Sequence, residues 1–189
     1  MKMKVRSLIT MSLIAGSLVL TSCGDQKKEN NDQVSEEKHE MNDHSEEMKA
    51  DKVSEEANAE FKDQNVTQAY EEYLSVKDAL VGTDAAAAGK AAQNLQKTLA
   101  EAKPEIAEIA GKLADTEDVN AQREVFSELT AAMEPVLKDA ISSGKIYKQF
   151  CPMAFEGKGD YWYSSSEEIR NPYFGDKMLK CGRVDETIM

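Results

Sequence analysis

Apolar residues recur every three or four positions along three long segments of the chain, and this periodicity constrains the fold more than any other feature. The segments cover residues 66–81, 88–113 and 125–141. Such a pattern is typical of amphipathic helices that bury one face. Many core-facing positions are alanine, so the helices should pack closely and leave no large internal cavity. The pattern predicts an all-α fold, a small up-and-down helical bundle.

Residues with strong capping preferences mark the ends of these segments. The candidate N-caps are, in order, Asn65 or Thr67, Thr83 or Asp84, and Thr116 or Asp118. Gly82 is expected to end the first helix. The second apolar stripe stays in phase through Pro104, which favours a kink or a tight break there over a redirected chain. Pro135 lies inside the third segment.

Residues 1–22 have the features of a secretory signal peptide. A positively charged start precedes an apolar run, residues 7–20, that is too short to span a bilayer as a helix. The run ends in Leu20-Thr21-Ser22-Cys23, which resembles the lipobox of bacterial lipoproteins, so we expect cleavage before Cys23 and acylation of that residue. Gly24 follows the cysteine in place of an aspartate, which favours the outer membrane, with the protein facing the periplasm.

The next segment, residues 23–60, has a composition that cannot form a core. From Gly24 to Glu60 there are 13 acidic and 5 basic residues, and no aromatic residue, leucine or isoleucine. Such a segment cannot bury enough apolar surface to offset the entropy lost on ordering its backbone. We predict a lipidated, disordered, acidic tether that leads to a folded domain starting near Phe61.

Within the tether, His39, Met41, His44 and Met48 place two imidazoles and two thioethers close together. Cu(I) and Ag(I) prefer such soft ligands. A flexible segment restricts the spacing of its side chains little, so the same residues also fit an ordinary polar linker. We interpret them as a secondary, weak metal site.

The composition argues against several classes of function. A net charge of −12 opposes binding to the phosphates of nucleic acids. The two histidines both lie in the tether, so the folded part has no histidine for catalysis. Nucleophile-elbow, P-loop and dinucleotide-binding motifs do not occur. A binding protein is therefore expected, not an enzyme.

Residues 147–189 differ in character from the predicted bundle, residues 61–146. Eight of the 12 aromatic residues fall between positions 147 and 174, among glycines and prolines. This composition predicts an irregular, aromatic-rich C-terminal cap packed on the bundle. Trp162 is interpreted mainly as part of the core of this cap, with a cation–π contact to a bound ion as the alternative.

The cap also holds Cys151 and Cys181, each with a methionine close by in sequence, Met153 and Met178 respectively. Two thiolates and two thioethers make a ligand set that suits Cu(I) or Ag(I) and suits magnesium or calcium poorly. These four residues are the predicted metal site. If residues 178–181 are helical, Met178 and Cys181 lie one turn apart on the same face.

A disulfide between Cys151 and Cys181 is the alternative for the same sulfurs. The compartment predicted by the signal peptide is oxidising, and a bridge closing this loop would stabilise the fold by about 3 to 4 kcal/mol. Thiol-redox catalysis through Cys151 is a third interpretation, which lacks a CxxC pair and an evident base. The spacing leaves the metal site and the disulfide equally favoured.

Several motifs of the chain resemble a family of domains of unknown function. They are Tyr147-x-Gln149-Phe150-Cys151-Pro152-Met153, Gly159-x-x-Trp162, Glu168-Ile169-Arg170-Asn171-Pro172-Tyr173-Phe174-Gly175-Asp176-Lys177-Met178-Leu179-x-Cys181-Gly182, Tyr73-Leu74-x-x-Lys77-Asp78-Ala79-Leu80-Val81 and Ala121-Gln122-Arg123-x-x-Phe126. The resemblance covers roughly residues 61–185. The family occurs as small lipoproteins of Gram-negative bacteria and as a domain fused to periplasmic membrane-fusion subunits of copper/silver-type efflux pumps.

The resemblance implies a periplasmic heavy-metal context and favours the metal interpretation of the cap. We therefore expect a lipid-anchored periplasmic protein that binds Cu(I) or Ag(I) in copper tolerance or efflux, with a membrane-fusion efflux subunit as its partner. The alternative is a disulfide-stapled structural adaptor of an efflux complex that binds no metal.

Overall fold

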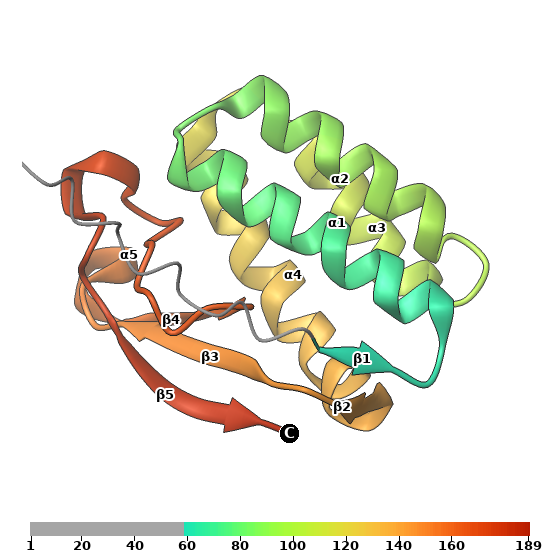
Figure 1. Cartoon of the computed structure of the whole chain (residues 1–189). Helices are drawn as coiled ribbons and strands as arrows, with labels where there is room; N and C mark the ends of the chain where they lie inside the picture. Colours follow the sequence, from blue (N-terminus) through green and yellow to red (C-terminus); the bar gives the residue numbers. More distant parts are fainter. Residues whose placement is uncertain (1–58) are drawn as a thin grey trace, which may run out of the picture. The chain divides into compact units, whose positions relative to one another are not determined.

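The computed structural model of the protein describes residues 59–189, which combine helices with two antiparallel sheets. The long helices are α1 (Gln64–Val81), α2 (Ala85–Leu99), α3 (Pro104–Ala114) and α4 (Val119–Ala140). The strands are β1 (Glu60–Phe61), β2 (Ile141–Ser143), β3 (Ile146–Cys151), β4 (Asp160–Ser164) and β5 (Arg183–Ile188), and the short segments are α5 (Ala154–Gly157) and η1 (Gly175–Met178) (Figure 1). The predicted all-α class is therefore wrong, and the fold is mixed.

The ends of three long helices follow from local capping. Asp84 and Asp118 cap α2 and α4, as expected, because each carboxylate accepts hydrogen bonds from backbone N–H groups of the first turn. Gly82 ends α1, also as expected. The predicted N-cap of α1, Asn65 or Thr67, is wrong. Asp63 is the N-cap residue, and its carboxylate accepts a hydrogen bond from the N–H of Asn65 at 2.8 Å.

The chain turns back at Pro104, where the sequence favoured a kink or a tight break. Helix α2 ends at Leu99, and α3 begins at Pro104 and packs beside α2 (Figure 1). Proline suits a first helical turn because its missing N–H would have no partner there. The apolar stripe stays in phase across the turn because both helices face the same core. Pro135 lies within α4, as predicted.

The predicted irregular cap is a three-stranded antiparallel sheet with strand order β4-β3-β5. In the central strand, Gln149 lies opposite Trp162 of β4, and Phe150 lies opposite Arg183 of β5. The alternation of strand β3 was hidden in the sequence by Gln149, a polar residue that is fully buried. A smaller sheet pairs β1 with β2 at the end of α4.

One aromatic core joins the helices to the sheet. The ring of Tyr73 in α1 stacks on Phe126 of α4, with centroids 5.2 Å apart, and also lies 6.1 Å from Tyr163 of β4. Tyr173 contacts both Phe126 and Trp162. All five rings are buried, so the sheet packs on the bundle through a continuous apolar layer.

Arg123 of α4 fixes the segment before η1 to the bundle. Its guanidinium donates to the carbonyl of Pro172 at 2.8 Å, to the carbonyl of Leu80 at 3.2 Å, and to the side chains of Thr83 and Asn120. One buried side chain therefore holds α1, α4 and the segment after β4 together.

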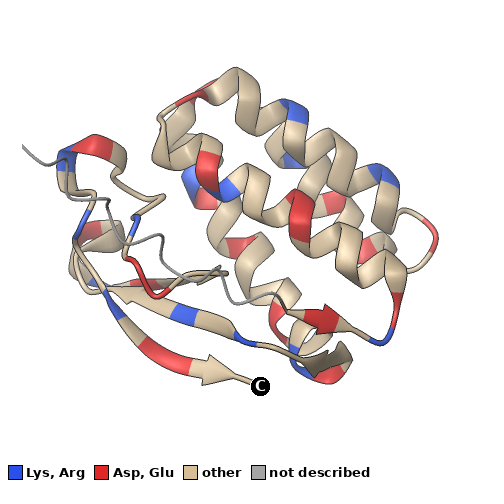
Figure 2. Ribbon diagram, in the orientation of Figure 1, with Lys and Arg blue, Asp and Glu red and all other residues tan. Residues whose placement is uncertain are grey.

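Charges of both signs are spread over the helices and the sheet (Figure 2). Among residues 59–189, no helix combines the length and the apolar character needed to span a bilayer.

Candidate thiol site

Cys151 and Cys181 meet at the end of the three-stranded sheet. Cys151 is the last residue of β3 and is fully buried, whereas Cys181 lies just before β5 and is half-buried. Because Phe150 pairs with Arg183, the antiparallel register brings residues 181 and 182 beside Cys151. The two sulfurs lie 3.4 Å apart, and both cysteines are free thiols. The structure thus brings together the two predicted cysteine ligands from positions 30 residues apart.

The approach of the two cysteines requires a glycine beside them. Gly182 has a φ of 152°, and a Cβ atom there would lie 2.9 Å from Cη2 of Trp162 and 3.0 Å from the carbonyl oxygen of Phe150. Any larger residue would push the chain away from the sheet. Gly182 therefore allows Cys181 to reach Cys151.

Trp162 forms the buried wall next to this glycine. Its side chain is fully buried and makes an edge-on contact with Tyr173, with ring centroids 6.1 Å apart. This placement agrees with its interpretation as a core residue. Its indole N–H is buried and has no hydrogen-bond partner within residues 59–189.

The backbone around Met153 contacts the thiol pair. Its backbone N–H acts on the thiol of Cys181 and lowers the pKa of that group, and its side chain is 50% exposed. The following residues, Phe155 and Glu156, have φ values of 49° and 61°, in the left-handed region that side chains rarely adopt. Such backbone strain is typical of turns that the surrounding structure holds in place.

Met178 ends η1 and contacts Cys181 through the backbone. Its carbonyl accepts a hydrogen bond from the N–H of Cys181 at 2.9 Å, so the two residues share one turn. The helix over residues 178–181 that the sequence expectation assumed is not formed, because η1 ends at Met178 and a turn follows it. The contact that places Met178 beside Cys181 is thus made by its backbone.

Asn171 positions the Cys181 segment and was given no role by sequence reasoning. It is fully buried, its side-chain N–H donates to the carbonyl of Cys181 at 2.8 Å, and its side-chain oxygen accepts from the N–H of Tyr173. An asparagine directly before a proline is typical of such side-chain-to-backbone turns. The Asn171-Pro172 pair therefore carried the information needed to find it.

The environment keeps the Cys181 thiol protonated near neutral pH. Burial raises the pKa of Cys181, the neighbouring Cys151 thiol raises it further, and the hydrogen bond from the N–H of Met153 opposes these effects. Binding a cation or forming a disulfide at this site must therefore displace protons. Residues 59–189 contain no cluster of three or more His, Cys, Asp or Glu side chains able to hold a metal ion.

The other predicted site residues lie outside the described residues. These are the lipidation site Cys23 and the tether residues His39, Met41, His44 and Met48.

Comparison with known proteins gives one match. A family model described as "Protein of unknown function (DUF3347)" matches residues 69–144. This range runs from within α1 to the turn after β2, so it covers the bundle and ends before the cysteine pair. No curated protein and no solved structure matches the chain.

Proposed function

We propose a function from the thiol site itself, because the family model that matches residues 69–144 describes a protein of unknown function. Cys151 and Cys181 bind a soft monovalent cation, Cu(I) or Ag(I), in a lipid-anchored protein of the bacterial envelope. The observation that carries the proposal is the 3.4 Å separation of the two sulfurs, with one of them fully buried. Thiolate sulfur is the side-chain donor that such cations prefer.

The sulfur separation is close to what a shared ion requires. Two sulfurs about 2.3 Å from one tetrahedral ion lie about 3.8 Å apart, so the pair needs to open by only a few tenths of an ångström. A disulfide needs a sulfur separation of about 2.0 Å, which is a larger movement in the opposite direction. A tetrahedral ion has two further ligand positions, which we assign to the thioethers of Met153 and Met178.

Ion binding in this proposal releases the thiol protons. Two thiols lose two protons when both sulfurs coordinate Cu(I), and the raised pKa of Cys181 makes the second proton costly to remove. Apparent affinity should therefore fall as the pH is lowered. The tether residues His39, Met41, His44 and Met48 would act as a weaker capture site, and Cys23 would anchor the protein to the membrane.

The biological role that we propose is copper or silver tolerance, with a periplasmic membrane-fusion subunit of an efflux pump as the partner. The support for this context is the resemblance of the cap motifs to domains found in such pumps. Acylation at Cys23 would keep the protein on the outer membrane, where it can meet such a subunit.

The test is competition for Cu(I) between the reduced full chain and a chromogenic chelator. Cys151→Ser or Cys181→Ser should abolish high-affinity binding, and Met153→Leu or Met178→Leu should weaken it while leaving the fold intact, because leucine is close to methionine in volume. Met189→Leu is the matched control, since Met189 is exposed and lies at the chain terminus. A variant with His39 and His44 both changed to alanine separates the tether from the thiol site.

The same 3.4 Å separation supports a second candidate, a disulfide-stapled adaptor that binds no metal. A free-thiol count on protein isolated from the periplasm distinguishes the two, since one pair of sulfurs cannot serve both roles at once. Two reactive thiols are expected for the metal protein and none for the adaptor. Cu(I) binding that survives both cysteine substitutions would overturn the metal proposal.

A further inference from the structure

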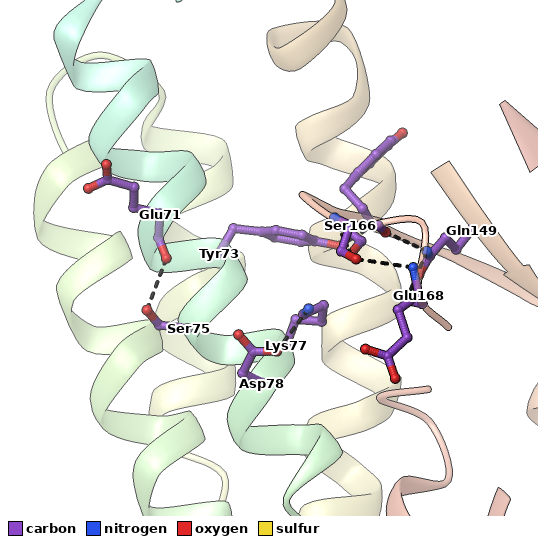
Figure 3. A network of polar contacts seen from close by, with 10 residues as sticks. Glu71, Tyr73, Ser75, Lys77, Asp78, Gln149, Ser166 and Glu168 are labelled. Atoms are coloured by element: carbon purple, nitrogen blue, oxygen red, sulfur yellow. Dashed lines mark hydrogen bonds and ion pairs between the residues drawn. The ribbon is translucent and has the colours of Figure 1, made fainter. Parts of the chain in front are cut away.

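A second polar site lies between α1 and the part of the chain that precedes Cys181. A pocket of about 420 Å³ opens between the last turn of α1 and the chain that joins β4 to η1. Figure 3 shows Lys77 and Asp78 on α1 facing the segment that carries Ser166 and Glu168. The lining residues used below are Lys77, Asp78, Ser164, Ser165, Ser166, Glu168, Arg170 and Asp176.

Lys77 is the unusual member of this lining. Its side chain is only 7% exposed, although its ammonium forms an ion pair with Asp78, 2.8 Å away, whose side chain is 61% exposed. A buried ammonium is costly unless its hydrogens find acceptors. Asp78 accounts for one of its three hydrogens, and it is the only ion-pair partner of Lys77 in the described part of the chain. The remaining donors are available to a ligand in the pocket.

The serine run opposite Lys77 adds further donors. The hydroxyl oxygens of Ser164 and Ser166 accept hydrogen bonds from the backbone N–H groups of Ser166 and Glu168, each at 3.1 Å. Within residues 59–189, no acceptor binds the hydroxyl hydrogens of these two serines or of Ser165. The site therefore offers up to three hydroxyl donors beside an ammonium.

Buried contacts hold this serine segment in place without a ligand. Gln149, which is fully buried, donates its side-chain amide hydrogens to the carbonyls of Ser166 and Glu168, at 2.9 Å and 3.2 Å. On the other side, Gly175 has a φ of 56°, and a Cβ atom there would lie 2.9 Å from the carbonyl of Val81. The close approach at Gly175 sets η1 and Asp176 against the end of α1. The pocket is thus preorganised.

The charges of the lining select the kind of anion. Glu168 pairs with Lys180, which lowers the pKa of Glu168, and Asp78 pairs with Lys77. Arg170 adds one positive charge and Asp176 one negative charge, and neither forms an ion pair within residues 59–189. The lining is rich in donors yet close to neutral, so a dianion such as phosphate would be repelled by the three carboxylates. A ligand with a single carboxylate matches both the many donors and the near-neutral charge of the lining.

We propose that this pocket binds a small monocarboxylate, whose oxygens accept hydrogen bonds from Lys77 and from the hydroxyls of Ser164 to Ser166. Arg170 at the rim attracts the anion, and Asp176 excludes more highly charged ones. The site uses neither cysteine and goes beyond the metal proposal.

Titration of the ¹⁵N-labelled full chain with sodium propionate, at constant ionic strength, tests the proposal by NMR. Saturable shifts are expected for the amides of Ser165, Ser166 and Gly82. Lys77→Met should weaken binding by about tenfold or more, because a charge-assisted hydrogen bond is lost. Lys145→Met is the matched control, since Lys145 is exposed in the turn between β2 and β3, and it should leave propionate binding unchanged.

Two further variants keep the test decisive if Lys77→Met fails to fold. Ser165→Ala removes a hydroxyl that makes no hydrogen bond within the described residues, and Arg170→Met changes an exposed side chain, so both should fold and bind propionate more weakly. Shifts that never saturate, equal binding of phosphate or glycerol, or affinity unaffected by all three substitutions would overturn the proposal. Propionate binding should persist in Cys181→Ser, which separates this site from the thiol site.

Discussion

The bundle and the cap are built by different kinds of contact. In the bundle, α1, α2 and α3 pack against their neighbours in the sequence, and alanine and leucine fill the space between them. In the cap, β3 pairs with β4 and with a strand more than 30 residues further along the chain. The first kind of contact is apolar and local, and the second depends on segments that meet only in the folded chain.

The two regions also differ in the polar groups that they bury. Three polar side chains hold the cap together from inside: Arg123, Gln149 and Asn171, each nearly or fully buried and each donating to backbone carbonyls of the cap. Removing one leaves its partners buried and unpaired, which costs more than the net stability of the original hydrogen bond. The cap should therefore be sensitive to substitutions that change a single polar group.

The largest effect is expected for Arg123→Met. The substitution keeps much of the aliphatic stem but removes the guanidinium donor from the carbonyl of Pro172, while the carbonyl of Leu80 keeps the N–H of Thr83. We expect a loss of about 3 kcal/mol in the free energy of unfolding. Urea unfolding followed by circular dichroism measures this loss. Arg170→Met is the control, because Arg170 is exposed, and it should change stability by less than about 0.5 kcal/mol.

Equal effects of the two arginine substitutions would show that the contacts of Arg123 do not hold the cap. Tryptophan fluorescence adds a regional readout, since Trp162 lies in the sheet. If the cap loosens first in Arg123→Met, the fluorescence transition should come at lower urea concentration than the circular dichroism transition.

A smaller effect is expected where α1 meets the sheet. The hydroxyl of Tyr73 shares a hydrogen bond with Thr130 at 2.8 Å and accepts one from the backbone N–H of Tyr163 at 3.1 Å. Tyr73→Phe leaves that N–H buried and unpaired, which should cost about 1 to 2 kcal/mol in the free energy of unfolding.

Tyr70→Phe is the matched control on the same helix. The Tyr70 hydroxyl is buried and makes no hydrogen bond within residues 59–189, so its removal should be neutral or slightly stabilising. Urea unfolding of both variants gives the comparison. A Tyr70→Phe variant as unstable as Tyr73→Phe would show that ring packing, not the hydrogen bond between helix and sheet, decides these values.

Sequence reasoning predicted the helices better than the sheet, and the reason is physical. Helix periodicity and capping by Asp84 and Asp118 act within a few residues, so the sequence displays them directly. The reversal at Pro104 was missed because two antiparallel helices that face one core keep the same apolar phase. Aromatic and β-branched residues near 146–150 and 161–163, bounded by glycines, are typical of strands and could have indicated β3 and β4.

The candidate sites show the same difference between features visible in the local sequence and features that arise only in the folded chain. The pairing of Cys151 and Cys181 was anticipated, since two cysteines in one small cap have few other partners, and the structure places their sulfurs in contact. The contribution of Gly182 comes from the close approach of segments and could not be read from spacing alone. The Asn171-Pro172 pair indicated a turn, but not the hydrogen bond from Asn171 to the carbonyl of Cys181. The pocket at Lys77 was also missed, because it joins α1 to a serine run almost 90 residues away.

The smallest effect, and the one with a pH signature, is expected for Glu134→Gln. Glu134 of α4 lies 2.7 Å from the ammonium of Lys148 in β3 and 2.9 Å from that of Lys138, and hydrogen bonds from Lys148 and then Lys138 lower its pKa to about 2. This network is the ionic link between the bundle and the sheet. The side chain of Glu134 is 32% exposed, so solvent screening should limit its contribution to the free energy of unfolding to about 1 kcal/mol at neutral pH.

The sign of the pH dependence follows from the lowered pKa. A carboxylate whose folded pKa lies below its unfolded value of about 4.3 contributes its full stability above that pH, and the contribution disappears as the pH falls towards 2. The gap in unfolding free energy between wild type and Glu134→Gln, measured in urea at pH 6, 4 and 2.5, should therefore shrink with acidification. Glu128→Gln, on an exposed position of the same helix, should show no such gap. A gap that stays constant between pH 6 and 2.5 would mean that Glu134 stabilises the contact between bundle and sheet through packing and not through its charge.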